Sequence, residues 1–443
     1  MRLSIERMAY GFDAVSHDED GKTVFVQGGV PGDVVEAHVT SEGKTFSRAI
    51  IDEVLEPSPA RVEPRCPYAS ACGGCPWSNM TYPAQLLAKR ANVADALRRI
   101  GHLDAERVDS LMRDIVPSER QWGYRNKAEL AVVDDEAGGI SLGMHARSDR
   151  GLVKVDECLL LPEGSRRLPK SVGGALKFLS SSRELGLQRV GMRVSERTRQ
   201  TEIALWTDPQ AFPRQTVAKV LTDAAKPTSI ARVLVKGDGA ARKVARIERL
   251  AGKGEWVERV AGQRMHLSAP SFFQVNTAGA ETLVHLVMEG LDIQDDDVAC
   301  DLYCGAGTFT LPLARRAHGG VVAVESYGPA VRDLKRNVEG SELQDRVECI
   351  GDDAALVADV VDDADVIVVD PPRAGLASEV VEQLSECDAR AVAYVSCDPA
   401  TLARDLASFA RLGGLVPVSV TPVDLFPQTF HVETVVMLSR VSD

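Results

Sequence analysis

Apolar and polar residues alternate with a period of two along residues 1–56. The alternation is clear in residues 23–26, 33–39 and 47–54, and a glycine-rich run at 28–32 separates the first two. Alternation bounded by glycine and proline turns is typical of short strands that bury one face. Several such strands in so short a segment predict a small β-barrel.

The next part of the chain, after the Pro57-Ser58-Pro59 boundary, mixes helical and strand patterns. Residues 82–100 have helical spacing, with Gly101 suited to the helix end and Lys89 away from the apolar face. That face comprises Leu86, Leu87, Val93, Ala94 and Leu97. Further helices are expected at 176–185 and 213–221, and strands at 128–133, 140–145, 190–195, 202–206 and 230–235. The pattern predicts an α+β domain.

From residue 271 onward, strand and helix patterns alternate. Such alternation predicts a Rossmann-like α/β sheet, in which ligands bind outside the carboxyl ends of the strands. The expected strands are 298–302, 321–324, 347–350, 365–369 and 391–395, followed by an antiparallel edge hairpin of 415–420 and 432–438.

The composition is that of a globular protein, and the length of 443 residues allows two to four domains. The charged fraction is 26% and the hydrophobic fraction 44%, without an apolar run long enough for a membrane span. Nine unevenly spaced cysteines and a start without signal-peptide features favour a reducing, cytoplasmic location. We therefore expect a cytoplasmic protein without membrane contact.

The charge is unevenly distributed along the chain, whose net charge is -13. Residues 160–254 contain 19 Lys and Arg against 8 Asp and Glu. The same counts are 11 against 27 in residues 290–443 and 5 against 11 in residues 1–56. A basic middle segment is what a polyanion-binding surface requires. The alternative is a solvated basic face without a partner.

Cys66, Cys72 and Cys75 are separated by five and then by two residues, with Gly73 and Gly74 in the second interval. Glycines allow backbone amides to approach sulfur ligands closely, so the pattern predicts a metal site. A fourth ligand is needed, and Cys158 is the next cysteine along the chain. Zinc and an iron–sulfur cluster both suit four thiolates. The alternative is three unconnected thiols.

A glycine loop follows the strand at 298–302 and opens a helix. Glu325 closes the next strand, twenty residues after Gly305, where an acidic residue can bind a ribose diol. A nicotinamide cofactor would favour a third glycine at Thr310, whereas the sequence D-x-x-C-G-x-G suits an S-adenosylmethionine loop. We therefore expect S-adenosylmethionine as the cofactor.

Cys397 stands at the carboxyl end of the strand at 391–395, directly before a helix with Pro399 in its first turn. This position in an α/β sheet is where ligands bind. A catalytic thiol and a small buried hydrophobic side chain are both compatible with the position alone.

Taken together, these motifs resemble those of bacterial RNA 5-methyluridine methyltransferases that carry an iron–sulfur cluster, such as the enzymes that modify 23S ribosomal RNA. The resemblance covers nearly the whole chain, with Pro76-Trp77 after Cys75 where the family commonly has glutamine. It rests on residues 66–75 with Cys158, 124–127, 272–276, 301–305, 370–373, 396–399 and 431–433.

The resemblance implies three domains. These are a TRAM-type barrel over 1–56, a central RNA-binding domain over 57–265 and a methyltransferase domain over 266–443. The helix at 82–101 is a candidate to pack on the catalytic domain. The resemblance favours a 4Fe–4S cluster over zinc, ribosomal over transfer RNA, and a monomeric chain.

The chemistry of uracil assigns roles to two residues. Carbon 5 is too weak a nucleophile to accept a methyl group until a thiolate adds to carbon 6, a step of covalent catalysis. We assign that thiolate to Cys397 and, by resemblance, the base that removes the carbon 5 proton to Glu433, whose alternative is a solvated strand end. Cofactor contacts are expected from Gln274, Tyr303, Gly305, Glu325, Asp352 and Asp370. Cys304, beside the cofactor loop, is expected to be structural.

The target base must leave its stack to reach the thiolate, so single-stranded or loop RNA is the expected substrate. Two other interpretations remain at this point. One is a methyltransferase of DNA cytosine or a small molecule, and the other is a catalytically silent RNA-binding or ribosome-assembly protein of the same fold.

Overall fold

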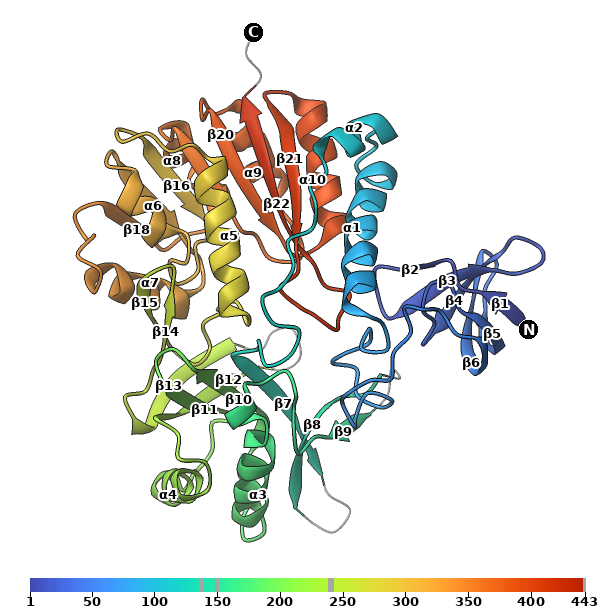
Figure 1. The fold of residues 1–443 in the computed structure, drawn as a ribbon. Helices are drawn as coiled ribbons and strands as arrows, with labels where there is room; N and C mark the ends of the chain where they lie inside the picture. The colour runs from blue at the N-terminus through green and yellow to red at the C-terminus, as the bar shows by residue number, and fades with distance from the viewer. Residues whose placement is uncertain (135–138, 148–150, 238–242, 441–443) are drawn as a thin grey trace. The chain divides into compact units, whose positions relative to one another are not determined.

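The computed structural model describes residues 1–134, 139–147, 151–237 and 243–440 (Figure 1). The chain divides into two compact units. The first comprises Met1–Gln121, Pro371–Leu376 and Tyr394–Asp443, and the second comprises Trp122–Asp370 and Ala377–Ala393.

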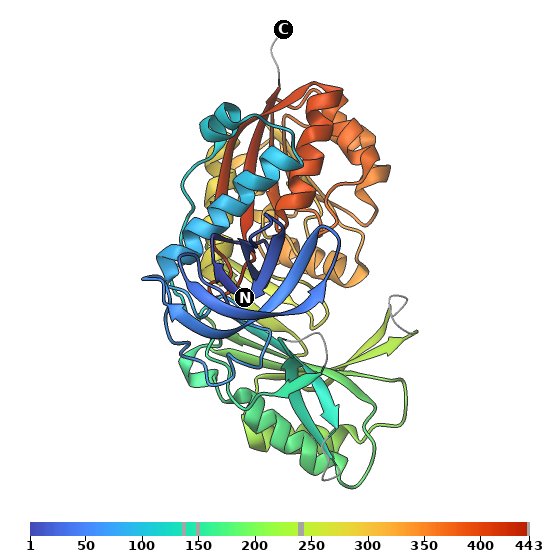
Figure 2. The ribbon, with the colours of Figure 1, turned by 90° about the vertical axis from the view of Figure 1, so that its right-hand side faces the viewer.

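The amino-terminal part of the first unit is a six-stranded sheet that curls into a half-barrel (Figure 2). The strand order is β1-β5-β6-β4-β3-β2, so β1 and β2 form its two edges. The strands are β1 (Arg2–Ser4), β2 (Arg7–Met8), β3 (Asp13–His17), β4 (Thr23–Gln27), β5 (Val34–Glu42) and β6 (Phe46–Glu56). The three strands expected from the alternation are confirmed, but the sheet is an open half-barrel.

Asp33 fixes the turn between β4 and β5 and the chain that leaves the sheet. Its buried carboxylate accepts from the amide of Val30 at 2.7 Å and from the amide of Ser58 at 2.9 Å. Arg61 supplies the compensating charge through its guanidinium group. The chain after the predicted boundary is thus tied back to the sheet by a partly buried ion pair between Arg61 and Asp33.

The rest of the first unit combines helices with an antiparallel strand pair. Helix α1 packs against α10, and β22 lies between β20 and the edge strand β21, as expected for the terminal hairpin. The elements are α1 (Tyr82–Arg99), α2 (Ala105–Leu111), β20 (Ala391–Ser396, of which residues 394–396 belong to this unit), α10 (Pro399–Leu412), β21 (Leu415–Val423) and β22 (Glu433–Arg440).

Helix α1 has the predicted bounds but not the predicted buried face. Leu87 is 70% exposed, whereas Lys89 is fully buried. The Lys89 ammonium donates to Asp424 Oδ1 at 2.5 Å and to the carbonyl of Phe426 at 3.0 Å. A buried charge is tolerated only when it is paired and hydrogen-bonded, and Asp424 is remote in the sequence. The prediction that Lys89 lies outside the packed face was therefore wrong.

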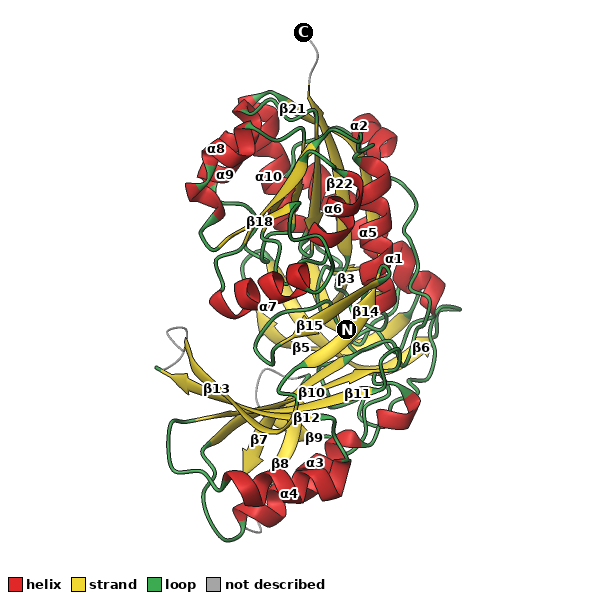
Figure 3. Cartoon of the chain, turned by 90° about the vertical axis from the view of Figure 1, so that its left-hand side faces the viewer, coloured by secondary structure: helices red, strands yellow, loops and turns green. Residues whose placement is uncertain are grey.

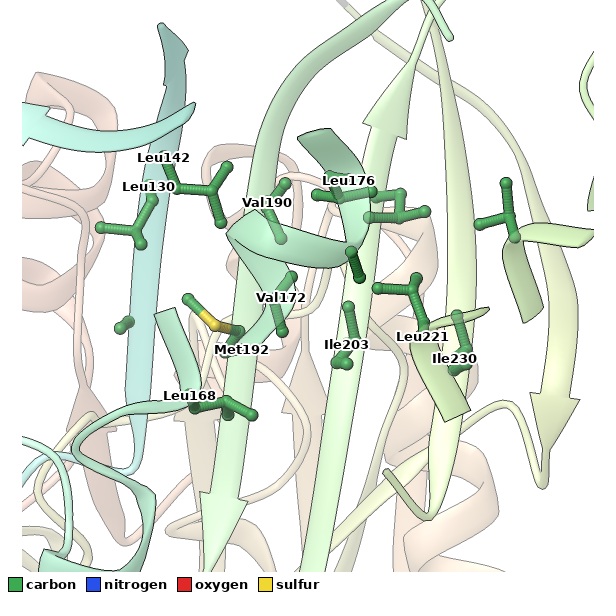
Figure 4. Close-up of a cluster of buried hydrophobic side chains, with 14 of the residues drawn as sticks. Leu130, Leu142, Leu168, Val172, Leu176, Val190, Met192, Ile203, Leu221 and Ile230 are labelled. Carbon is green, nitrogen blue, oxygen red and sulfur yellow. The ribbon is translucent and has the colours of Figure 1, made fainter. Parts of the chain in front are cut away.

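The second unit begins with a seven-stranded sheet in the order β13-β12-β11-β10-β7-β8-β9 (Figure 3). Helices α3 and α4 pack on this sheet, and Figure 4 shows the apolar core between them. The strands are β7 (Lys127–Asp134), β8 (Ile140–His145), β9 (Leu152–Lys154), β10 (Leu187–Ser195), β11 (Gln200–Thr207), β12 (Ser229–Lys236) and β13 (Lys243–Gly252).

The helices of this domain are η1 (Glu163–Ser165), α3 (Leu168–Ser180) and α4 (Arg214–Ala225). Helix α3 starts and ends earlier than the predicted 176–185. Pro169 lies in its first turn, where the backbone amide has no partner within the helix, so proline does not destabilise it. Leu168, Val172 and Leu176 form its buried face. The expected strands of the middle domain are confirmed, whereas β9, β13 and the hairpin of β14 (Trp256–Val260) and β15 (Gln263–Leu267) were not predicted.

The remainder of the second unit alternates strands and helices, as predicted. Its strands are parallel in the order β18-β17-β16-β19. The elements are α5 (Thr277–Gly290), β16 (Val298–Leu302), α6 (Thr310–Arg316), β17 (Gly320–Val324), α7 (Gly328–Glu339), β18 (Val347–Ile350), η3 (Ala354–Leu356), α8 (Ala358–Asp362), β19 (Val366–Val369) and α9 (Ser378–Glu386). Among the described residues, no helix has the length and apolar character needed to span a membrane.

Candidate active site

The predicted cofactor loop lies in the second unit, between β16 and α6. Tyr303, Gly305 and Gly307 all have positive φ angles, of 62°, 58° and 99°. Positive φ is unusual for tyrosine, and such strained backbone concentrates at functional sites. The glycines adopt it without a steric penalty, and the amide of Gly307 donates to the carbonyl of Cys304 at 2.9 Å inside the loop.

Glu325 lies at the carboxyl end of β17 and touches this loop. Its Oε2 accepts from the amide of Gly305 at 3.0 Å, and its Oε1 accepts from the amide of Tyr327 at 2.6 Å. The structure thus brings together the glycine and the acidic residue that the twenty-residue spacing predicted. Asp352 is exposed beyond the end of β18, where its Oδ1 accepts from the amide of Asp353 at 2.8 Å.

Three buried or partly buried groups near the strand ends have raised pKa values. Burial raises the pKa of Asp370, beyond the end of β19, to about 7. Burial also raises the pKa of Asp301, the last but one residue of β16, to about 7, although the hydroxyl of Thr310 donates to it at 2.6 Å. Burial, followed by the charges of Asp301 and Glu325, raises the pKa of Cys304 well above its usual range. The Cys304 thiol therefore stays protonated, in agreement with a structural role.

Gln274 is buried and belongs to a segment that pairs with residues 124–127. The side-chain amide of Asn126 donates to the carbonyl of Gln274 at 2.9 Å, and its backbone amide donates to the carbonyl of Val275 at 2.7 Å. Two motifs that are far apart in the sequence are thereby joined. Tyr124 is buried and Lys127 forms an ion pair with Glu129 at 3.0 Å, which favours the strand-end interpretation of this motif over RNA stacking.

Cys397 lies in the first unit, at the turn from β20 into α10. It is half-buried and stands directly before Asp398, the N-cap residue of α10. Asp398 Oδ1 accepts from the amides of Ala400 at 2.9 Å and Thr401 at 3.2 Å. The cap satisfies the first helical amides, so the turn presents the thiol rather than unpaired backbone donors.

Glu433 is the first residue of β22 and is only 2% exposed, so the alternative of a solvated strand end is excluded. In the loop that precedes Glu433, two aromatic side chains pack together. His431 packs on Phe430 with ring centroids 4.1 Å apart, and Nη2 of Arg373 lies 3.3 Å from His431 Nδ1. Phe430 also forms an edge-to-face pair with Tyr10, with ring centroids 5.4 Å apart.

The cysteines proposed as metal ligands are all half-buried. Cys66, Cys72 and Cys75 lie in one loop of the first unit, where the amide of Gly74 lies 3.4 Å from Cys72 Sγ, and Cys158 lies in the second unit. Across the residues that the structure describes, no group of three or more His, Cys, Asp or Glu side chains forms a metal site. The amide donor to sulfur nevertheless fits the donor set of a thiolate-held metal.

Two family models match parts of the chain. The model of tRNA (Uracil-5-)-methyltransferase matches residues 358–441, and the model of the TRM5/TYW2 methyltransferase domain matches residues 281–394. An uncharacterized RNA methyltransferase of Gloeobacter violaceus is 34% identical over 99% of this chain and 96% of its own. Another from Streptomyces avermitilis is 33% identical over 98% of this chain and 97% of its own.

A solved structure matches the whole chain. It is Pyrococcus abyssi tRNA (uracil-54, C5)-methyltransferase in complex with S-adenosyl-L-homocysteine, with a TM-score of 0.76 and 26% identity. The match covers 99% of this chain and 100% of that one. The chain belongs to the RNA uracil-5 methyltransferase family. It is an S-adenosylmethionine-dependent enzyme that methylates carbon 5 of uracil in RNA, so the expected activity and methyl donor are confirmed.

Two residues of this RNA uracil-5 methyltransferase were not singled out from the sequence. Asp301 Oδ1 is buried without a hydrogen-bond partner among the described residues, beside the cofactor loop. Its place at the head of D-x-x-C-G-x-G is a signal that could have indicated it. Tyr10 lies beside Cys397, and no local pattern in the sequence indicates that long-range contact.

Proposed function

We propose that Cys397 is the nucleophile and Glu433 the general base of this methyltransferase. The single observation that supports this assignment most strongly is the half-buried position of Cys397 at the carboxyl end of β20. Cys304, the other cysteine at a strand end near a glycine loop, is buried and held protonated. A thiolate is the reactive form of cysteine, so Cys397 is the better nucleophile.

The proposed reaction starts when the thiolate of Cys397 adds to carbon 6 of the uracil and makes carbon 5 nucleophilic. S-adenosylmethionine, when bound, supplies an electrophilic methyl group and leaves as S-adenosylhomocysteine. Glu433 then removes the proton from carbon 5. The electron pair of that bond re-forms the carbon 5–carbon 6 double bond and expels the thiolate, so the enzyme is regenerated.

The cofactor contacts are proposed for six residues of the second unit. The hydrogen bonds of Glu325 to the loop support a role at the ribose, and the positive φ of Tyr303 and Gly305 supports a ligand-binding loop. Burial and a raised pKa support Asp370 at the reactive end, because neutral carboxyl groups can donate to a ligand. Gln274 is proposed for the same end and the exposed Asp352 for the adenine end.

The RNA substrate is proposed to be a single-stranded or loop region of ribosomal RNA. Transfer RNA is the second candidate, and the printed names of the matching family model and of the Pyrococcus abyssi enzyme favour it. Mapping 5-methyluridine in both RNA classes from a strain without this protein decides between them. A site lost from ribosomal RNA and restored by the wild type, but not by Cys397→Ala, supports the proposal. Loss from transfer RNA alone overturns the ribosomal assignment.

We also propose that Cys66, Cys72, Cys75 and Cys158 hold a 4Fe–4S cluster that supports the fold. The amide of Gly74 near Cys72 Sγ suits a thiolate ligand. Protein purified without oxygen should contain about four irons per chain. Cys158→Ser should lose the iron and lower the unfolding temperature, because metal binding is coupled to folding. One zinc and no iron per chain would identify a structural zinc site instead.

Domain boundaries at 1–56, 57–265 and 266–443, a monomeric state and a cytoplasmic location complete the proposal. Light scattering on the purified chain would test the monomeric state, with 47.7 kDa as the expected mass. A dimer mass would overturn that part of the proposal. The many cysteines support a reducing location.

A further inference from the structure

The amino-terminal sheet contacts the backbone of Cys397. The hydroxyl of Tyr10, in the turn between β2 and β3, donates to the carbonyl oxygen of Cys397 at 3.2 Å. The two residues are 387 positions apart in the chain but belong to the same unit. A role for the sheet in binding RNA alone would not require this contact with the peptide group of the proposed nucleophile.

The contact falls at the turn from β20 into α10, where the Ser396 hydroxyl also donates to the carbonyl of Asp398 at 3.2 Å. Ser396 ends β20, and Asp398 is already the N-cap residue of α10, so Cys397 alone joins the strand to the helix. The orientation of the Cys397 carbonyl is coupled to the ψ angle of that residue, and hence to the direction in which its side chain leaves the turn. A hydrogen bond to that carbonyl therefore restrains the direction of the thiol.

The turn that carries Tyr10 is itself held in place. The amide of Ala9 donates to the carbonyl of Asp13 at 3.0 Å, and the indole Nε1 of the fully buried Trp77 donates to the carbonyl of Gly11 at 3.0 Å. The rings of Tyr10 and Phe430 pack edge to face, with an interplanar angle of 86°. A side chain fixed at its backbone and at its ring can hold its partner in one place.

Trp77 also connects this turn to the loop that precedes Glu433. Its backbone amide donates to the carbonyl of Gln428 at 3.0 Å. The Gln428 amide donates in turn to Oε1 of Gln85 at 2.8 Å. The supports of Tyr10 and of the segment leading to Glu433 thus meet at one buried tryptophan.

The phenol hydroxyl of Tyr10 is protonated and can donate a hydrogen bond at any ordinary pH. Burial, followed by the charge of Asp398, raises the pKa of Tyr10 above its usual range, against the lowering effect of Arg373. The hydroxyl therefore keeps its proton throughout the pH range in which a methyltransferase works. The hydrogen bond to Cys397 is consequently independent of pH.

We propose that Tyr10 is a positioning residue of the methyl-transfer reaction, which holds the peptide group of Cys397 so that the thiol points at carbon 6 of the uracil. The inference rests on the proposed role of Cys397 as nucleophile. It extends the active site into the amino-terminal sheet, to a residue that acts through Cys397 and not on the substrate.

Tyr10→Phe tests the inference because it removes only the hydroxyl and keeps the ring against Phe430. A small misalignment of a reacting group costs up to about 100-fold in rate. We expect the single-turnover rate of methyl transfer, and kcat, to fall by about 10- to 100-fold. The KM for RNA should change by less than about threefold, since no substrate contact is removed. The rate at which iodoacetamide alkylates Cys397, followed by peptide mass spectrometry, should change as well.

Ser16→Ala is the matched control. The buried Ser16 hydroxyl donates to the carbonyl of Ser4 at 2.7 Å, so this variant removes a bond of the same kind within the same sheet. It should lower the unfolding temperature without changing kcat or the alkylation rate of Cys397. If Ser16→Ala slows the reaction as much as Tyr10→Phe, the effect is one of sheet stability and the inference is overturned.

Cys397→Ala separates the inference from the function on which it rests. Loss of activity in Cys397→Ala with wild-type kcat and alkylation in Tyr10→Phe overturns the role of Tyr10 alone. Full activity of Cys397→Ala overturns the proposed nucleophile itself.

Discussion

Cys304 and Cys397 occupy equivalent places in two strand–turn–helix segments of the molecule. Cys304 follows β16 and precedes α6 in the second unit, and Cys397 follows β20 and precedes α10 in the first. Cys304 is 4% exposed and its pKa is raised by burial, whereas Cys397 is half-buried. The same topology therefore produces one inert thiol and one that is accessible for reaction.

The two turns also differ in their hydrogen bonds. The turn after β16 contains Gly305 and Gly307 with positive φ, and their amides donate to Glu325 Oε2 at 3.0 Å and to the carbonyl of Cys304 at 2.9 Å. The turn after β20 is closed by Asp398, whose carboxylate caps the helix. The first turn is thus fixed by glycines and by Glu325, whereas the second is fixed by a side-chain cap beside the half-buried Cys397.

The largest expected effect separates the two cysteines directly. Cys397→Ala should lower methyl transfer by on the order of 10⁴-fold or more, because the reaction loses its nucleophile. RNA binding should survive, which a filter-binding assay would measure. Cys304→Ala should lower the unfolding free energy by about 1–2 kcal/mol and leave the turnover within about tenfold of the wild type. Loss of methyl transfer in Cys304→Ala, with activity retained in Cys397→Ala, would show that Cys304 is the nucleophile.

The next effect concerns the base. Glu433→Gln should reduce turnover by about 10²- to 10⁴-fold, because the carbon 5 proton cannot leave. The methylated covalent adduct should then accumulate and be visible as a protein–RNA band on a denaturing gel. Glu348→Gln, an equivalent change at an exposed position of β18, is the control and should behave as the wild type. Normal turnover of Glu433→Gln would direct the search for the base to Asp370.

A smaller effect is expected at the cofactor loop. Glu325→Gln should raise the Kd for S-adenosylmethionine by about 10- to 100-fold, since hydrogen bonds to a charged group are lost. Asp352→Asn should have a weaker effect, because Asp352 is exposed. Calorimetry measures both values. An unchanged Kd in Glu325→Gln would contradict the proposed contact between Glu325 and the ribose of S-adenosylmethionine.

The smallest effect is a pH dependence of stability. Burial raises the pKa of Asp301 to about 7, so its neutral form stabilises the folded chain below the ordinary pKa of about 4. This contribution is lost as the pH rises toward 7. Relative to Asp301→Asn, which cannot ionise, the wild type should lose about 1–3 kcal/mol of unfolding free energy between those values. Parallel curves in urea titrations of the two proteins would contradict the shift.

The sequence predicted what depends on local periodicity. The strands at 23–26, 230–235 and 347–350 are all present, and so is the alternation that places Cys397 and Glu325 at strand ends. These features follow from apolar spacing and glycine positions, which act over a few residues. The activity and the methyl donor followed from motifs at those strand ends.

Long-range contacts were not predictable from the same patterns. From the sequence alone, Lys89 is expected on the surface, but in the fold it is paired with Asp424. Tyr10 is expected to be an ordinary loop residue, but in the fold it donates to the carbonyl of Cys397. Helix α3 was predicted at 176–185 but spans Leu168–Ser180, where Leu168, Val172 and Leu176 pack into the core of the seven-stranded sheet. In each case the deciding interaction, or the packed face, comes from elements that are distant in the chain.

The central claim, that Cys397 becomes covalently bound to the uracil, is tested most directly with RNA that carries 5-fluorouridine at the target position. Fluorine at carbon 5 cannot be removed as a proton, so the methylated adduct should persist on the wild-type enzyme. After digestion, mass spectrometry should find the methylated nucleotide on the peptide that contains Cys397. An adduct on Cys304, or complete methylation of normal RNA by Cys397→Ala, would contradict the claim.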